Sequence, residues 1–126
     1  MDPMIVVVLF LVGAVLIWWF NRQRGQGPPD SQIDEALAAG AALIDVRNVG
    51  EFAIGHAPGA RNIPVDELGL RLADVGEAPA TVVVYCRTGM RSSRAATILT
   101  AAGFTVLNAR TLGQVERILR DRSWES

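Results

Sequence analysis

Cysteine is almost absent from this sequence of 126 residues: Cys86 is the only one, so no internal disulfide can form. A single free thiol suits a reducing compartment. Lysine is missing altogether, and the twelve basic residues are balanced by 13 acidic residues to a formal net charge of −1. The chain therefore lacks the basic excess of nucleic-acid-binding proteins, and we expect no nucleic-acid partner. A chain of this length, 50% apolar and without internal repeats, has room for one folded domain and little else.

Charged residues are missing from one long stretch, Met4 to Phe20, which contains 17 residues. At about 1.5 Å per residue, a helix of this length just spans the hydrocarbon core of a membrane. Trp18 and Trp19 fit the aromatic belt at a membrane interface. A cleavable signal peptide would have a basic start and a small-x-small cleavage site, whereas Asp2 and Pro3 precede this stretch and bulky residues end it. We interpret residues 4–20 as a retained transmembrane helix; the alternative is a buried core helix or an uncleaved secretory segment.

The residues after this stretch, 21–30, form a predicted linker that is too short to let a domain move far from the membrane. Arg22 and Arg24 give this flank a positive charge, while no basic residue precedes the apolar stretch. By the positive-inside rule, we expect the rest of the chain in the cytoplasm and the N-terminus outside. The stretch has no G-x-x-x-G pair, and the sequence leaves the oligomeric state open.

A strand-like run leads directly to Cys86. Residues Val82–Tyr85 are apolar and too few for an independent helix, which favours a strand buried on both faces. After a short loop that contains Gly89, a helical pattern runs from Arg91 to a stop at Gly103. Cys86 therefore lies between a strand end and a helix N-terminus, where loop N–H groups and the helix dipole favour the thiolate. A lone cysteine is more often an inert buried side chain, but this context favours a nucleophile.

The rest of the chain alternates helices and strands. Ser31 is predicted to cap a helix that ends at Gly40, and Asn48 with Glu51 forms a capping-box pattern at the start of a short helix. Further strands are predicted at 42–46, 60–63 and 104–107, and further helices at 64–75 and 111–122. This alternation favours an α/β domain over residues 31–122, with a parallel sheet covered by helices on both faces, and then a tail, 123–126. In such sheets nucleophiles lie beyond the carboxyl ends of strands, as Cys86 does.

The loop from Cys86 to Arg91, CRTGMR, resembles the C-R-x-G-x-R active-site loop of single-domain rhodaneses, the thiosulfate-type sulfurtransferases. Upstream segments resemble further signatures of this family, in the family's order: Asp45-Val46-Arg47, Glu51-Phe52, Gly55–Ala60 and Asn62-Ile63-Pro64. The resemblance covers residues 31–122 and implies a rhodanese-like fold. One departure is Leu112-Gly113, where the family usually has a Gly-Gly pair.

The resemblance implies that Cys86 takes a sulfane sulfur from thiosulfate or a similar donor, holds it as a persulfide and passes it to cyanide or a thiol. Backbone N–H groups can stabilise the anionic persulfide without a second catalytic side chain, and no cofactor or metal is expected. Because the chain has no second cysteine, the acceptor must be external. Arg87 and Arg91 are expected to orient a dianionic donor, although either could merely line the loop rim. The whole predicted active-site loop consists of Arg87, Thr88, Gly89, Met90, Arg91 and Ser92.

Three polar residues upstream are given structural roles. By analogy with the fold, Asp45 and Arg47 are expected near the site as an ion pair or hydrogen bond that holds the loop, rather than as catalytic groups. His56 is the only histidine, and its Gly-His-Ala-Pro-Gly surroundings are typical of a turn. A thiolate that the loop already favours needs no general base, so we assign His56 no catalytic role.

Two other functions are weaker alternatives. Cysteine phosphatases and arsenate reductases also place a cysteine loop before a helix. The phosphatase loop needs its arginine six positions after the cysteine, however, and Ser92 stands at that position here. The other alternative is a non-catalytic rhodanese-like module that recruits a partner to the membrane. The intact cationic loop around Cys86 favours the enzyme, because a scaffold has no physical reason to retain it.

Overall fold

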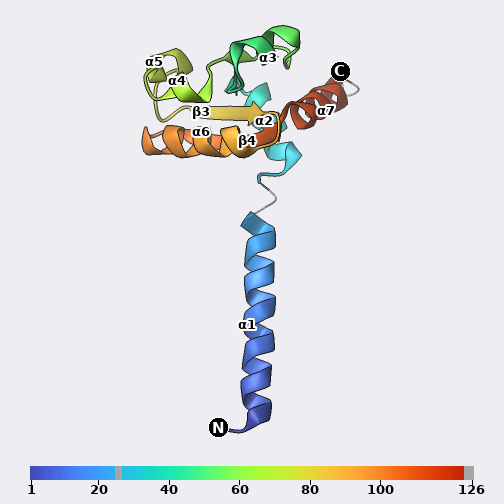
Figure 1. Cartoon of the computed structure of the whole chain (residues 1–126). Helices are drawn as coiled ribbons and strands as arrows, with labels where there is room; N and C mark the ends of the chain where they lie inside the picture. The colour runs from blue at the N-terminus through green and yellow to red at the C-terminus, as the bar shows by residue number, and fades with distance from the viewer. Residues whose placement is uncertain (25–26, 124–126) are drawn as a thin grey trace.

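The computed structural model describes residues 1–24 and 27–123. Residues 25–26 of the predicted linker and 124–126 of the predicted tail lie outside the described residues. A long N-terminal helix, α1 (Pro3–Arg24), precedes an α/β domain that contains one sheet with helices packed on it (Figure 1).

The sheet has four parallel strands in the order β2-β1-β3-β4. The strands are β1 (Ala42–Asp45), β2 (Arg61–Asn62), β3 (Thr81–Cys86) and β4 (Thr105–Thr111). β3 lies between β1 and β4, so the run predicted to end at Cys86 is an inner strand. Val82, Val83 and Val84 are completely buried, in agreement with the expected burial on both faces.

Side chains of β3 alternate between two cores, because successive strand residues point to opposite faces of a sheet. On one face, Val82, Val84 and Cys86 pack with α4 (Val65–Leu68), α5 (Leu72–Val75) and α6 (Met90–Ala101). On the other face, Val83 and Tyr85 pack with α2 (Asp30–Ala38) and α7 (Leu112–Ser123). Cys86 therefore points to the face that α6 covers, at the strand end where α6 begins.

The short helix α3 (Val49–Ile54) begins with the predicted capping box. Asn48 Oδ1 accepts the Glu51 N–H at 2.8 Å, and Glu51 Oε1 accepts the Asn48 N–H at 3.3 Å. This prediction is confirmed, and it matters for the site because the same Glu51 carboxylate also reaches the cysteine loop.

The predicted cap of α2 is wrong. Pro29, with an extended backbone at φ −66° and ψ 152°, occupies the cap position, and Ser31 lies inside the helix. Pro29 has its φ fixed by its ring and suits a helix start without a side-chain cap. Asp30, the first helical residue, binds Arg117 and Gln114 of α7 at 2.8 and 3.0 Å, so the helix start is held by a tertiary contact.

Other predicted boundaries also shift. The helix predicted over 64–75 is two short helices, because Leu70 and Arg71 close tight turns to Glu67 and Leu68 instead of continuing the helix. β4 runs on to Thr111, beyond the predicted end at Leu107, because an irregularity in its pairing with β3 keeps the two strands joined. α1 continues into the predicted linker and ends at Arg24.

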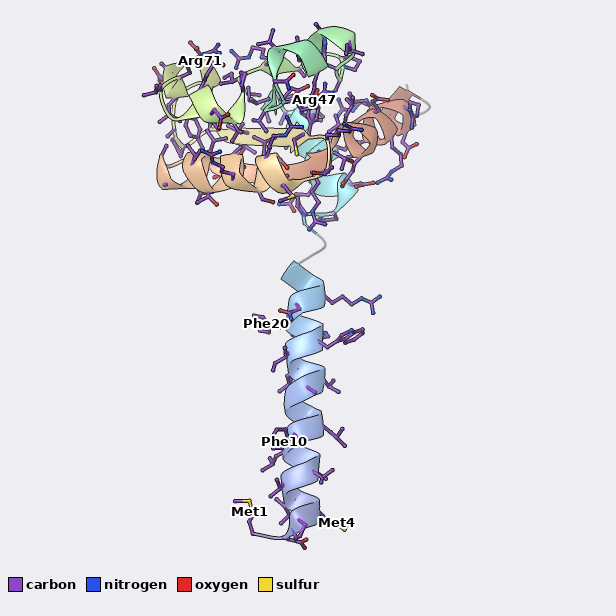
Figure 2. All side chains as sticks on the ribbon, viewed as in Figure 1. Met1, Met4, Phe10, Phe20, Arg47 and Arg71 are labelled. Atoms are coloured by element: carbon purple, nitrogen blue, oxygen red, sulfur yellow. The ribbon has the colours of Figure 1, made fainter. Side chains whose placement is uncertain are left out.

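α1 (Pro3–Arg24) carries the apolar N-terminal stretch. Side chains project from both sides of the helix in Figure 2, where the labelled Phe10 and Phe20 lie on the left. The segment Pro3–Arg22 is long and apolar enough to cross a membrane, and its apolar window is 0% buried. The Arg22 guanidinium lies 5.1 Å from the centre of the Trp18 ring, so the charged end of the helix begins beside an aromatic residue suited to a membrane interface.

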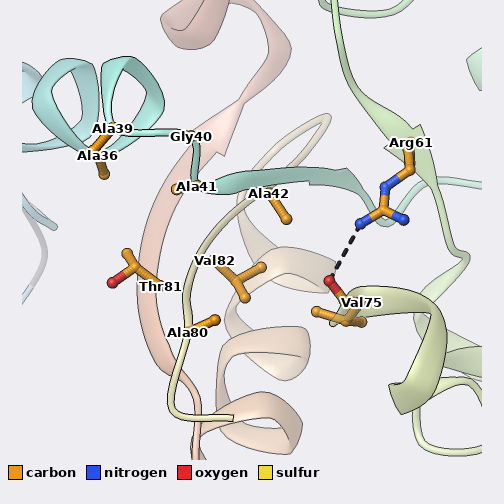
Figure 3. A pocket seen from close by; sticks show the side chains of 10 residues that line it. All are labelled: Ala36, Ala39, Gly40, Ala41, Ala42, Arg61, Val75, Ala80, Thr81 and Val82. Carbon is orange, nitrogen blue, oxygen red and sulfur yellow. Dashed lines mark hydrogen bonds between the residues drawn. The ribbon is translucent and has the colours of Figure 1, made fainter. Parts of the chain in front are cut away.

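An open pocket of about 580 Å³ lies at the opposite end of the sheet from Cys86 (Figure 3). Its walls come mainly from the starts of β1 and β3 and from the end of α2, and half of the ten lining residues are alanines. Arg61 Nη2 donates to the Val75 carbonyl at 3.2 Å on one side. None of the cysteine-loop residues borders this pocket.

Candidate active site

Cys86 is the last residue of β3 and is completely buried. Its Sγ accepts the Gly89 N–H at 3.0 Å and the Ser92 N–H at 3.4 Å. The Ser92 hydroxyl oxygen lies 3.5 Å from the same sulfur. These groups belong to the loop and to the first turn of α6, so the sulfur lies where backbone dipoles point toward it.

Gly89 makes this loop geometry possible. It occupies the cap position of α6 with φ 98° and ψ −11°, a left-handed conformation that glycine adopts without the steric cost other residues meet. The chain thereby reverses direction between β3 and α6 within a few residues, and the Gly89 N–H turns inward to the sulfur.

Burial raises the pKa of the Cys86 thiol, because a buried thiolate loses its hydration. Hydrogen bonds from the Ser92 hydroxyl and from the N–H groups of Ser92, Gly89 and Thr88 lower the pKa and outweigh burial. The net pKa of Cys86 therefore lies below the ordinary value for a thiol. The site favours the thiolate, which is the nucleophilic form of cysteine.

Arg91 lies in the first turn of α6 and is bound by Glu51 of α3. Nη1 donates to Oε1 at 2.6 Å and Nη2 donates to Oε2 at 3.0 Å. The hydrogen bond from Arg91, opposed by partial burial, lowers the pKa of Glu51 to about 2. Sequence reasoning missed this pair, because the two residues are 40 positions apart and no local pattern links them.

The other predicted loop residues lie at the surface. Arg87, Thr88 and Met90 are exposed. Arg87 borders an open pocket of about 490 Å³ beside the cysteine loop, with further walls from Arg47, from α3 and from the start of α7. Arg87 therefore places a cationic side chain on the wall of a pocket beside the loop.

Asp45 and Arg47 form a buried ion pair, with Arg47 Nη2 2.7 Å from Asp45 Oδ2. Arg47 Nη2 also donates to the Gly55 carbonyl at 2.6 Å, just beyond the end of α3. The hydrogen bond to Asp45 raises the pKa of Arg47 despite its burial. The pair thus holds α3, which carries Glu51, and this is the geometry of a structural ion pair.

His56 lies on the surface, outside these contacts. Its ring stacks on Phe52 with centroids 3.7 Å apart, and its Nδ1 lies 2.9 Å from the Phe52 carbonyl oxygen. In the part of the chain that the structure describes, no group of three or more His, Cys, Asp or Glu side chains is placed to hold a metal ion.

This chain is similar to several known proteins. Residues 14–111 match the family model of the rhodanese-like domain. The uncharacterized protein YqhL of Bacillus subtilis is 37% identical over 109 residues, which cover 83% of this chain and 84% of that protein. The thiosulfate sulfurtransferase PspE of Escherichia coli is 41% identical over 63 residues, which cover 49% of this chain and 61% of that protein.

A solved structure agrees with these relatives. The human single-domain sulfurtransferase TSTD1 superimposes with a TM-score of 0.55 and 31% identity, over 66% of this chain and 85% of that one. The parallel α/β sheet, the cysteine loop at a strand end and the match over most of the sequence lead to one conclusion: this chain belongs to the rhodanese family, which includes sulfurtransferases.

Proposed function

We propose that this chain is a sulfurtransferase that carries a sulfane sulfur as a persulfide on Cys86. One observation carries the proposal: Cys86 Sγ accepts hydrogen bonds from the Gly89 and Ser92 N–H groups, which favour the thiolate in spite of complete burial. The same N–H groups suit the anionic persulfide that follows.

The proposed reaction has two steps. The Cys86 thiolate attacks the outer sulfur of thiosulfate; the new S–S bond forms as the bond to sulfite breaks, and sulfite leaves with the bonding electron pair. An acceptor such as cyanide then attacks the outer sulfur of the persulfide, giving thiocyanate and restoring the thiolate. Charge is conserved in each step and no oxidant is needed, so the chain requires no redox partner for the transfer.

Thiosulfate is proposed as the donor because PspE, which is similar to half of this chain, is named as a thiosulfate sulfurtransferase. Arg87 and Arg91 are proposed to orient this dianion, Arg87 from the rim of the adjoining pocket and Arg91 from the first turn of α6. The acceptor is cyanide or an external thiol, because Cys86 is the only cysteine and no second thiol in the chain can take the sulfur.

The proposal includes a location at the inner face of a membrane. The apolar helix α1 supports an anchor, and Arg22 and Arg24 at its C-terminal end support a cytoplasmic domain. The short linker then keeps Cys86 close to the bilayer.

Mass spectrometry of the full chain in detergent tests the proposal. Thiosulfate should add the mass of one sulfur atom to Cys86, and cyanide should remove it as thiocyanate. Cys86→Ser should stay folded, because a hydroxyl fits the same group of donors, but it should carry no sulfur. If the reduced and folded wild-type chain gained no sulfur from any donor in a panel, catalysis would be excluded and the recruiting module would be the better account.

A further inference from the structure

Arg110, near the end of β4, has an unusual backbone. Among the described residues other than glycine, it alone has a positive φ, at 68°. An arginine in this left-handed region meets a steric cost that glycine avoids, so its surroundings must hold it there. Residues held in such conformations cluster at functional sites.

An irregular pairing of β3 and β4 produces this backbone. Val84 pairs with Asn108, but the next residue, Tyr85, pairs with Arg110, so Ala109 is an extra residue in β4. Asn108 Oδ1 accepts the Arg110 N–H at 2.9 Å and so supports the left-handed turn. Bulges of this kind redirect a side chain, and they are frequent beside active sites.

The bulge brings Arg110 against the cysteine loop at two points. A Cβ built on Gly89 would lie 3.4 Å from Arg110 Cβ and 3.7 Å from Arg110 Cγ, so the aliphatic stem of the arginine covers Gly89. The Ser92 hydroxyl lies 3.5 Å from the Arg110 carbonyl oxygen. Gly89 and Ser92 are two of the residues whose N–H groups donate to Cys86 Sγ.

The outer end of the side chain meets a different segment. Arg110 Nε lies beside Gly27, where a built Cβ would be 3.2 Å away. Arg110 therefore has two conceivable roles, to dock the chain that leads from α1 or to shape the cysteine loop. The stem packing on Gly89 favours the second, because it acts on the residue that makes the shortest hydrogen bond to the sulfur.

We infer that Arg110 is a positioning residue, whose left-handed backbone and aliphatic stem hold Gly89 and Ser92 with their N–H groups directed at Cys86 Sγ. This inference rests on the proposed use of Cys86 as a sulfur carrier. It predicts that a variant at this position can keep or gain stability while the pKa of the Cys86 thiol rises.

Arg110→Gly separates the effect on stability from the effect on the thiol pKa. Glycine adopts a φ of 68° freely, so the unfolding midpoint of the full chain should stay the same or rise. Loss of the stem frees Gly89, however, so the pKa of Cys86 should rise by about 0.5 to 1 unit, the effect of weakening one hydrogen bond. The thiolate absorbance in the ultraviolet reports this pKa directly, because Cys86 is the only cysteine and Cys86→Ser supplies the blank.

Arg110→Gln is the matched variant, because it keeps Cβ and Cγ over Gly89 and removes the charge. Its thiol pKa should stay within about 0.2 units of the wild-type value, a difference too small for a lost hydrogen bond. Arg61→Gln removes an arginine charge at the opposite end of the sheet and should leave the pKa of the Cys86 thiol unchanged. If Arg110→Gly left the pKa unchanged, or if the Gln variant shifted it as much, the positioning role would be overturned.

A second variant covers the case in which Arg110→Gly does not fold. Arg110→Ala removes Cγ and the rest of the stem and keeps only Cβ over Gly89, so it should raise the thiol pKa in the same direction. A fall in stability together with an unshifted pKa in this variant would leave Arg110 a merely structural role and overturn the inference. The pKa is measured without any sulfur donor, so its outcome is independent of whether the chain transfers sulfur.

Discussion

Glu51 and Arg91 join helix α3 to the cysteine loop through two parallel hydrogen bonds, of 2.6 Å between Oε1 and Nη1 and of 3.0 Å between Oε2 and Nη2. The Glu51 carboxylate closes the capping box of α3 as well. The buried pair of Asp45 and Arg47 holds the far end of the same helix at Gly55. α3 is therefore fixed at both ends, and it forms a rigid wall beside the loop that carries Cys86.

Replacing Glu51 by glutamine should make stability less dependent on pH. The folded pKa of Glu51 is about 2, below its ordinary value of 4.5, so the ion pair stabilises the fold above about pH 4.5 and loses this effect as the pH falls toward 2. Wild type should thus unfold at a higher temperature than Glu51→Gln at pH 7, and the difference should vanish near pH 2. Glutamine can still accept the Asn48 N–H, so the comparison measures the loss of the Glu51 charge alone.

Glu67→Gln is the control for this series. Glu67 forms an exposed ion pair with Arg71 at 3.7 Å, and such pairs contribute little to stability. Its unfolding temperature should follow the wild-type value at every pH. A difference between wild type and Glu51→Gln that persisted at pH 2 would contradict the assigned pair.

Arg91→Ala should weaken the use of thiosulfate. A charge-assisted hydrogen bond to a dianion contributes about 1.5–3 kcal/mol, which corresponds to roughly one to two orders of magnitude in kcat/KM. Because the single variant also leaves Glu51 without its partner, the double variant Glu51→Gln/Arg91→Ala should be measured with it. Arg94→Ala, which removes an exposed arginine of the same helix, serves as the control. Unchanged thiosulfate kinetics in both Arg91 variants would remove this residue from the site.

Local sequence patterns predicted some parts of this molecule and missed others for a physical reason. The strand before Cys86, the helix after it and the cap at Asn48 depend on residues that are neighbours in the chain, and all three are present. The start of α2 was missed because Asp30 is held by α7, a contact that no local pattern contains. The apolar spacing of residues 64–75 predicts one helix, because it carries no sign of the turn at Leu70 and Arg71.

The same distinction applies to the site. The donors to Cys86 Sγ come from the contiguous loop between β3 and α6, for which the sequence predicts N–H groups directed at the sulfur. The engagement of Arg91 by Glu51 and the position of Arg110 depend on tertiary contacts and on an irregular strand pairing. Neither feature has a signature in a single sequence.

Asp45→Ala should destabilise the fold by about 3–5 kcal/mol, because it leaves the buried Arg47 guanidinium without its counter-charge. Chemical unfolding of the full chain in detergent measures the change. Asp66→Ala breaks an exposed pair with Arg94 and should cost at most about 1 kcal/mol. Similar losses in the two variants would show that burial of the Asp45–Arg47 pair contributes nothing beyond an ordinary surface pair.

The proposed topology predicts the outcome of proteolysis. The cations Arg22 and Arg24 follow the apolar segment and none precedes it, so the domain should be cytoplasmic. Protease added to intact cells should leave the domain uncut, and permeabilised cells should lose it. Digestion in intact cells would place the domain on the opposite side of the membrane.

Ser92→Ala should move the pH dependence of sulfur loading to higher pH. Burial raises the pKa of the Cys86 thiol, and the Ser92 hydroxyl is the largest of the influences that lower it. Without this hydroxyl the pKa should rise, so less thiolate is present at a given pH and loading by thiosulfate slows below the pKa. At higher pH, where the Cys86 thiol is fully ionised in both wild type and variant, their loading rates should converge. Ser93→Ala is the matched control, because the Ser93 hydroxyl donates to the Gly89 carbonyl at 2.8 Å and not to the sulfur. An unshifted profile in Ser92→Ala, or the same shift in Ser93→Ala, would show that the Ser92 hydroxyl does not act on the thiolate.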